Sequence, residues 1–116
     1  MKNKNIINTF FCSVNGLKAL LQEKSAKREI FLLIFSIFYG LTIKPDFIFI
    51  LLLLILPVLI LSMEALNTAI EYTCNEITTN KSNRIRKAKD LGSAAIFLSL
   101  VVYAFVFFLS FYQKFF

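Results

Sequence analysis

The sequence predicts an all-α membrane protein, in which one amphipathic surface helix and three transmembrane helices form a single domain spanning 1–116. Two observations predict this fold class. Of the 116 residues, 58% are hydrophobic and only 17% are charged, and so small a soluble domain would not bury that much apolar surface. The apolar residues also gather in three uncharged runs, at 30–43, 47–63 and 91–112. A membrane protein is therefore favoured over a soluble domain.

The first element, 1–29, is predicted to be a helix on the membrane surface. Between Ile6 and Leu21, apolar residues recur at spacings of three and four, which is typical of a helix with one apolar face. Lys18 and Lys24 suit the polar face of a helix that lies at the membrane surface.

The first transmembrane core, 30–43, is an uncharged run of fourteen residues. A bilayer needs about 20 helical residues, so we expect this helix to take in a turn of the preceding segment, 25–29. The letters "KPD" at 44–46 predict a tight turn, because Pro45 favours a helix boundary.

The second transmembrane core, 47–63, is expected to continue as helix through 64–76. Pro57 lies inside it and is expected to kink it, which membrane helices tolerate. The polar segment 77–90 is predicted to be a loop or the start of the next helix. The third core, 91–112, is long enough to cross a bilayer on its own.

Lysine and arginine residues are distributed unevenly around these segments. Six precede the first core and five lie in 77–90, whereas only Lys44 lies in the first turn and only Lys114 follows the third core. Because basic residues are concentrated on the cytoplasmic side, the N-terminus and the 77–90 loop are predicted to be cytoplasmic and the C-terminus periplasmic. The net charge of +6 then reflects orientation in the membrane, and we expect no nucleic-acid partner.

The end of the second core carries a stripe of polar residues. On a helix, Glu64, Asn67, Glu71 and Asn75 fall on one face. Glu64 follows the apolar run directly, where a lone carboxylate is costly unless it is paired or protonated. Desolvation disfavours its charged form, so we expect a raised pKa at Glu64, which suits a general base near neutral pH. The alternative, that such residues only mark the end of the span, fits Glu76 better.

Further charged residues are predicted to reach the same membrane surface. Glu23 and Glu29 precede the first core, and Lys89 and Asp90 precede the third. Carboxylates suit Mg²⁺, which proteins usually hold together with substrate phosphates, and phosphoryl transfer needs mainly positioning and charge neutralisation. The sequence has no GxxxxGK[ST] motif, so a nucleotide site would have to be built from helix side chains.

Two segments together resemble the prokaryotic diacylglycerol kinase family, which also contains undecaprenol kinases. They are "EALNTAIE" at 64–71 and "KDLGSAA" at 89–95. The resemblance implies an integral-membrane lipid kinase of the bacterial cytoplasmic (inner) membrane, which transfers the γ-phosphate of MgATP to a lipid hydroxyl. It also implies a homotrimer with shared active sites. Partner chains would help to shield the polar stripe, which three helices alone can hardly cover.

The resemblance also implies roles for individual residues. Glu64 would be the general base, Glu71 and Glu23 would bind both the metal and ATP, and Asn67 would support the lipid acceptor. Further ATP contacts are implied for Asn80, Lys81, Ser82, Lys89 and Asp90. Further lipid contacts are implied for Lys18, Glu29 and Ser93.

Some alternatives stay open at this level. The family usually has Asp where this chain has Asn75, so either that position is not essential or Glu76 compensates for it. The segment "KDLGSAA" favours diacylglycerol over undecaprenol as the acceptor. A small non-catalytic membrane oligomer would have no use for the polar stripe, and a small transporter would need charges near the middle of the bilayer.

Overall fold

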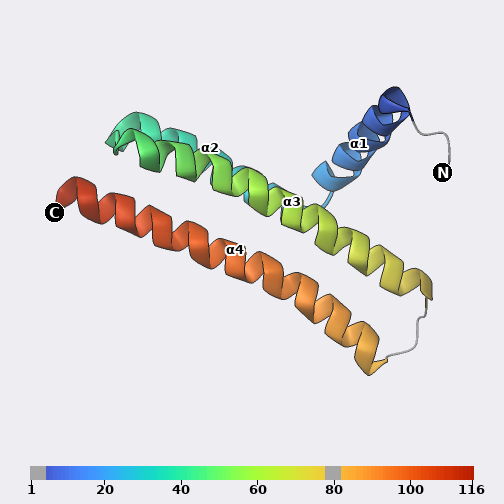
Figure 1. Ribbon diagram of the computed structural model, residues 1–116. Coiled ribbons are helices and arrows are strands. Elements are labelled where there is room, and N and C mark those ends of the chain that lie inside the picture. The colour runs from blue at the N-terminus through green and yellow to red at the C-terminus, as the bar shows by residue number, and fades with distance from the viewer. Residues whose placement is uncertain (1–4, 78–81) are drawn as a thin grey trace.

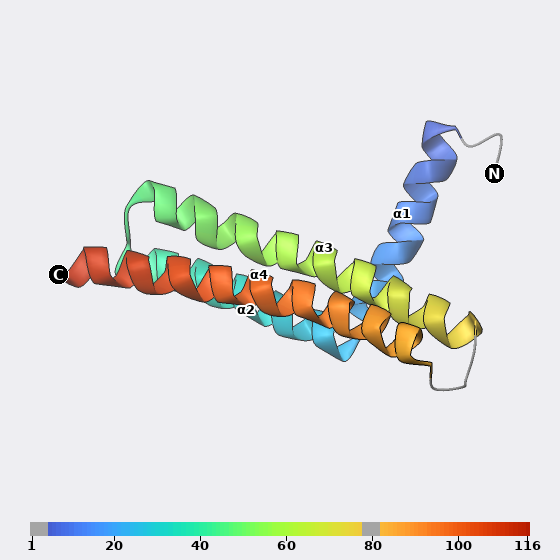
Figure 2. The same cartoon turned by 60° about the horizontal axis from the view of Figure 1, so that its bottom comes forward.

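The computed structural model describes residues 5–77 and 82–116, and these form four helices. They are α1 (Ile6–Leu21), α2 (Lys24–Ile43), α3 (Phe47–Ile77) and α4 (Asn83–Phe115). Helices α2, α3 and α4 run side by side as a bundle, while α1 projects away from it near the start of α2 (Figure 1, Figure 2). The all-helical fold class is therefore confirmed for this part of the chain.

The predicted surface helix over 1–29 is divided in the structure. Helix α1 is capped by Asn5, whose side chain accepts a hydrogen bond of 2.8 Å from the backbone N–H of Asn8, and it ends at Leu21. Helix α2 then begins at Lys24, so 24–29 continues into the first apolar core. This confirms the expectation that the short core takes in a preceding turn, and it corrects the boundary of the surface helix.

A tight turn joins α2 to α3, as predicted. Lys44 ends α2 in the left-handed conformation, with φ of 55°, a common way to end a helix. The carbonyl of Asp46 accepts the backbone N–H groups of Phe49 and Ile50 at 3.0 and 3.2 Å. The Nζ of Lys114 donates to the carbonyl of Lys44 at 3.2 Å, which ties the end of α4 to this turn.

Helix α3 passes through Pro57 without interruption and reaches Ile77, as expected for the continuation of the second core. For 77–90, either a loop or the start of the next helix was predicted, and the structure shows a helix start, because α4 begins at Asn83. Ser82 caps it by accepting a 3.2 Å hydrogen bond from the backbone N–H of Arg84. Polarity alone suggested a loop there, but the following Arg, Lys and Ala residues are good helix formers.

The core of the bundle is small. It centres on Tyr39, Leu53, Ile60, Ile96 and Tyr103. The ring of Tyr39 packs on that of Phe107, with the ring centroids 4.8 Å apart. Most other large apolar side chains lie on the outside of the bundle, among them Phe31, Phe38, Phe105 and Phe108, all about two-thirds exposed.

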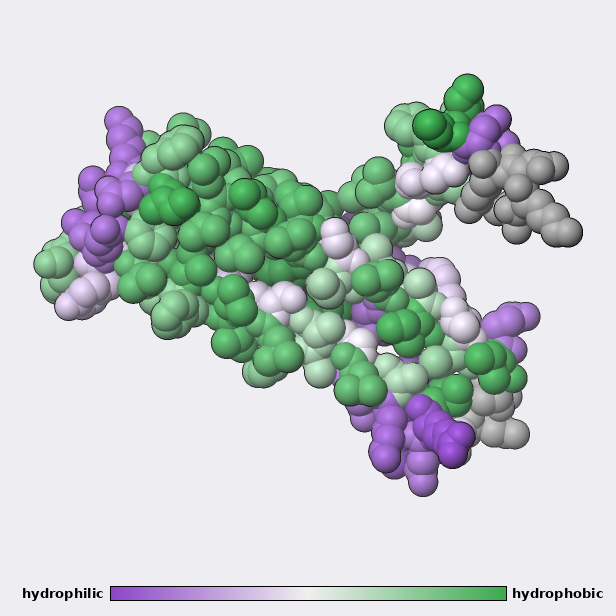
Figure 3. Space-filling view, in the orientation of Figure 1, coloured by the Kyte–Doolittle hydropathy of each residue, from purple (hydrophilic) through white to green (hydrophobic). Residues whose placement is uncertain are grey.

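The space-filling view shows what this arrangement implies. Hydrophobic residues cover the middle of the face in view, and hydrophilic residues gather towards the ends of the bundle (Figure 3). Helices α3 and α4 are long and apolar enough to cross a membrane. An apolar surface of this extent indicates a protein surrounded by lipid.

Candidate active site

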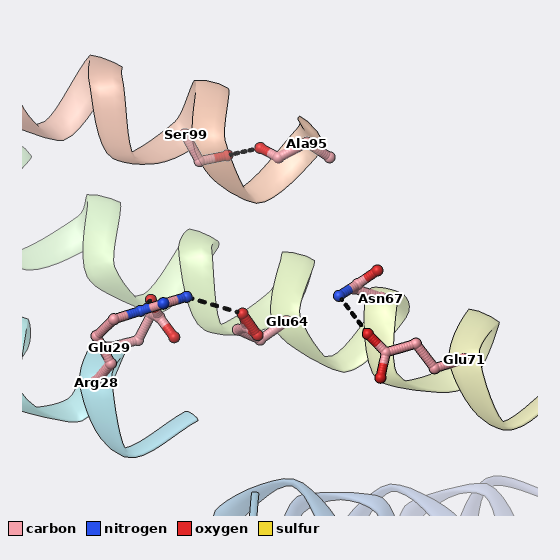
Figure 4. Close-up of polar contacts among 7 residues, drawn as sticks. All are labelled: Arg28, Glu29, Glu64, Asn67, Glu71, Ala95 and Ser99. Atoms are coloured by element: carbon pink, nitrogen blue, oxygen red, sulfur yellow. Dashed lines mark hydrogen bonds and ion pairs between the residues drawn. The ribbon is translucent and has the colours of Figure 1, made fainter. Parts of the chain in front are cut away.

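Two buried carboxylates meet between α2 and α3, on the side of the bundle where α2 begins. The side chains of Glu29 and Glu64 are 0% and 2% exposed. Arg28 lies between them (Figure 4). Its Nε lies 3.0 Å from Oε1 of Glu29, and its Nη2 lies 3.3 Å from Oε1 of Glu64. One guanidinium therefore joins the two carboxylates, while 55% of its own side chain remains exposed.

Each of these carboxylates keeps one oxygen without a hydrogen-bond partner. Within 5–77 and 82–116, Oε2 of Glu29 and Oε2 of Glu64 are buried and unpaired. Ser25 lies in α2, one turn before Glu29, and is close to Glu64 of α3. It forms no hydrogen bond to Oε2 of Glu64. A buried polar atom without a partner is costly, so its presence calls for a functional explanation.

Asn67 and Glu71 continue the polar stripe along α3. The Nδ2 of Asn67 donates to Oε1 of Glu71 at 3.2 Å (Figure 4). The Oδ1 of Asn67 is buried and lacks a partner in the described part of the chain. It lies against Gly92 of α4, where an added Cβ atom would overlap it. The absence of a side chain at Gly92 thus lets α4 approach the amide of Asn67 closely.

Glu23 and Glu71 are the two residues predicted to bind a metal. The Oε1 of Glu23 accepts a 2.6 Å hydrogen bond from the hydroxyl of Tyr72, which directly follows Glu71 in α3. Over the described residues, no group of three or more metal-ligating side chains occurs. Mg²⁺ is often held by only one or two carboxylates plus substrate phosphates, so metal binding by Glu23 and Glu71 stays a prediction.

The predicted nucleotide residues lie around the start of α4. The Nζ of Lys89 donates to Oδ1 of Asn75 in α3 at 2.8 Å. The amide that replaces the family's usual Asp thus bonds an ammonium group here. Asp90 is exposed, and Ser82 acts as the cap of α4. Asn80 and Lys81 lie outside the described residues.

Not all of the predicted residues come together within one chain. Glu29 and Glu64 are joined through Arg28, and Asn67 and Glu71 are bonded to each other. Lys18 in the last turn of α1 and Ser93 in α4 are exposed. No catalytic or binding role was predicted for Arg28 or Tyr72. Their only signal was adjacency in the chain, since Arg28 precedes Glu29 and Tyr72 follows Glu71.

An apolar groove lies beside this cluster, between α1 and α3. Its volume is about 480 Å³, and residues from both helices line it, including Gly16, Leu17, Leu20, Ala65, Thr68 and Tyr72. Ala65 follows Glu64 directly in α3, but the side chain of Glu64 faces α2 and does not line the groove. A lipid chain has the chemistry that such a groove accepts.

Comparison with known proteins decides the family. The family model described as prokaryotic diacylglycerol kinase matches residues 11–111. The chain belongs to this family. Both segments that carried the resemblance, 64–71 and 89–95, lie within the matched range. The kinase prediction is therefore confirmed, and the non-catalytic oligomer and the transporter are set aside.

Two relatives named diacylglycerol kinase support the assignment to the prokaryotic diacylglycerol kinase family. The one from Haemophilus influenzae is 31% identical over 99 residues, which cover 84% of this chain and 84% of the relative. The one from Helicobacter pylori is 32% identical over 104 residues, which cover 89% of this chain and 81% of the relative. Family membership and the two long apolar helices together place this kinase in a membrane.

Proposed function

We propose that the protein transfers the γ-phosphate of MgATP to the hydroxyl of diacylglycerol and so makes phosphatidic acid. The observation that carries this proposal is Glu64, a buried carboxylate with one unpaired oxygen, in a helix that also lines an apolar groove. A lipid chain in the groove would bring its glycerol hydroxyl towards this oxygen. The relatives from Haemophilus influenzae and Helicobacter pylori are named for the same substrate class.

Glu64 acts as the general base in this proposal. Its Oε2 takes the proton of the acceptor hydroxyl as the hydroxyl oxygen bonds to the γ-phosphorus. The bond from that phosphorus to the β–γ bridging oxygen breaks, and ADP leaves. A positioned base typically contributes about 10²–10⁴-fold to such a step. Asn67, with Glu29, Ser93 and Lys18, positions the acceptor lipid.

The nucleotide binds on the more exposed side of the stripe. Glu71 and Glu23 hold the Mg²⁺ that accompanies ATP, and this ion neutralises charge on the phosphates. Lys89 exchanges its bond to Asn75 for a bond to a phosphate oxygen. Four further residues complete the nucleotide site: Asn80, Lys81, Ser82 and Asp90. Glu64 and Glu71 lie about two helical turns apart on α3. This distance separates the lipid-binding part of the site from the ATP-binding part.

The protein crosses the bacterial cytoplasmic membrane three times, through α2, α3 and α4. The lysine and arginine distribution supports a cytoplasmic N-terminus and α3–α4 connection, with a periplasmic C-terminus. This orientation brings Glu64 and Glu71 to the cytoplasmic side, where ATP is available. A homotrimer would complete the site, because exposed residues such as Ser93 could then face the site of a neighbouring chain.

The acceptor is the part of this proposal that an assay tests most directly. Purified protein in mixed micelles receives MgATP with diacylglycerol or with undecaprenol, and radiolabelled lipid phosphate is measured. We expect phosphatidic acid as the main product and no product after Mg²⁺ is chelated. A preference for undecaprenol would change the acceptor but keep the reaction class. No phosphorylated product from either lipid would contradict the kinase mechanism proposed for Glu64.

A further inference from the structure

Arg28 bonds both buried carboxylates of the site, and neither the sequence motifs nor the family resemblance gave it a role. Its Nε bonds Glu29 in the same helix, and its Nη2 reaches 36 residues along the chain to Glu64. We infer that Arg28 is a positioning residue for phosphoryl transfer, which holds Oε1 of Glu64 and so presents Oε2 to the acceptor hydroxyl. This inference rests on the proposed role of Glu64 as the base.

The contacts of Arg28 suit this role. The bond to Glu29 anchors one edge of the guanidinium within α2, and the planar group then has a fixed direction towards α3. Only Oε1 of each carboxylate is engaged, so both Oε2 atoms remain unpaired in the described residues. The cation also offsets the repulsion between Glu29 and Glu64, two buried carboxylates that face the same group. Without it, the Glu64 carboxylate would lose its fixed orientation.

Two other roles for Arg28 make different predictions. A purely structural ion pair would affect the stability of the helix packing, although buried ion pairs often add little net stability. A direct contact to the lipid through the exposed part of the guanidinium would affect lipid binding and hence KM. A positioning role affects kcat, because the orientation of the base matters in the transition state and not for substrate binding.

The test compares three variants in the diacylglycerol assay. Arg28→Gln removes the charge, Arg28→Lys keeps the charge without the planar fork, and Lys27→Gln removes the same charge from the adjacent, exposed position. For Arg28→Gln we expect kcat to fall about ten- to a hundredfold, the loss typical of removing a hydrogen bond to a charged group. KM for diacylglycerol and for ATP should change less than about twofold if ground-state binding is unaffected.

The two matched variants sharpen the test. Arg28→Lys should have an intermediate kcat, since one ammonium group cannot hold both carboxylates in the same geometry. Lys27→Gln should match the wild type. Thermal unfolding in the same detergent checks folding, and if Arg28→Gln does not fold, the kcat and KM of Arg28→Lys decide the question.

Several results would overturn the inference. Wild-type kcat in Arg28→Gln would do so, and so would an unchanged kcat with a raised KM for diacylglycerol, which would indicate a lipid contact. If the wild type is active and Glu64→Gln is inactive, such a result rejects only the role of Arg28. If the wild type makes no lipid phosphate, or Glu64→Gln stays fully active, the proposed function itself fails and this inference fails with it.

Discussion

Two buried polar regions of this molecule differ in whether their polar atoms have hydrogen-bond partners. In the middle of the bundle, the hydroxyl of Ser36 pairs with that of Tyr103, and the hydroxyl of Tyr39 pairs with Ser110 at 3.0 Å. Each pair joins α2 to α4. At the end where α2 begins, Glu29 and Glu64 are buried just as deeply, yet each keeps an unpaired Oε2 atom in the part of the chain described here.

The difference separates groups that hold the fold from groups that act on a substrate. Hydroxyls in an apolar bundle are satisfied by one another, and such pairs fix which turns of neighbouring helices meet. Unpaired carboxylate oxygens weaken the fold, because their lost hydration is not replaced. Local departures from the packing rules are expected at functional sites. Variants at the two regions should therefore separate activity from stability.

The largest effect on activity is expected from Glu64→Gln. The amide keeps the size of the side chain and can still accept a hydrogen bond from Arg28, but it cannot take the hydroxyl proton. We expect turnover in the diacylglycerol assay to fall about 10²–10⁴-fold, the usual contribution of a general base. The thermal unfolding temperature should stay close to that of the wild type, and so should nucleotide binding.

Asp46→Asn is a matched control for this variant. It makes the same chemical change at an exposed residue in the α2–α3 turn, at the opposite end of α2, and should leave turnover unchanged. Near-normal turnover in Glu64→Gln would show that another group takes the proton. A large loss of stability would show instead that Glu64 belongs with the groups that hold the fold.

A smaller loss of activity is expected from Gly92→Ala. The new methyl group would overlap Oδ1 of Asn67, and the flexible amide must then turn away from its place beside Glu71. Displacement by about 1 Å near a reaction centre can cost about a hundredfold, and we expect turnover to fall about tenfold or more. Stability should change little, because alanine is the better helix former by about 0.5–1 kcal/mol and offsets the adjustment.

Gly40→Ala gives the comparison for Gly92→Ala. An added Cβ atom at Gly40 would meet only Ile50 at ordinary contact distance, 3.8 Å. This variant should be slightly more stable than the wild type and fully active. Equal turnover in both glycine variants would mean that the position of Asn67 does not matter for the reaction.

Much of this fold could be predicted from the sequence, because apolar runs and their lengths are one-dimensional properties. The extension of α3 past Glu64 and the turn at Pro45 followed from such signals. The start of α4 did not, since the polar segment after Ile77 gives no composition change at Asn83. No Gly or Pro marks the break between α1 and α2 in the sequence. The predicted surface helix was therefore longer than the observed α1.

The arrangement of the candidate site along a single helix could also be predicted from the sequence. Contacts between helices could not. Helical spacing alone placed Glu64, Asn67 and Glu71 on one face. It could not show that Arg28, and not its neighbour Lys27, turns towards α3, because that depends on how α2 packs. The close approach of Gly92 to Asn67 is likewise a property of packing. The catalytic, lipid-binding and nucleotide-binding roles of all the predicted site residues stay predictions.

The smallest effect on activity, and a measurable one on stability, is expected from Tyr103→Phe. This change leaves the buried hydroxyl of Ser36 without its partner, which in membrane helices costs about 0.6 kcal/mol on average and up to about 1.7 kcal/mol. Thermal unfolding should show this loss, whereas Tyr112→Phe, at an exposed tyrosine of the same helix, should be neutral.

Adding Ser36→Ala to Tyr103→Phe removes the unpaired hydroxyl and should recover part of the stability, because removing both partners of a hydrogen bond can be nearly neutral. Turnover should remain at the wild-type level in all three variants. If Tyr103→Phe lowered turnover as much as Gly92→Ala, the middle of the bundle would be coupled to the reaction, and pairing would no longer separate the two regions.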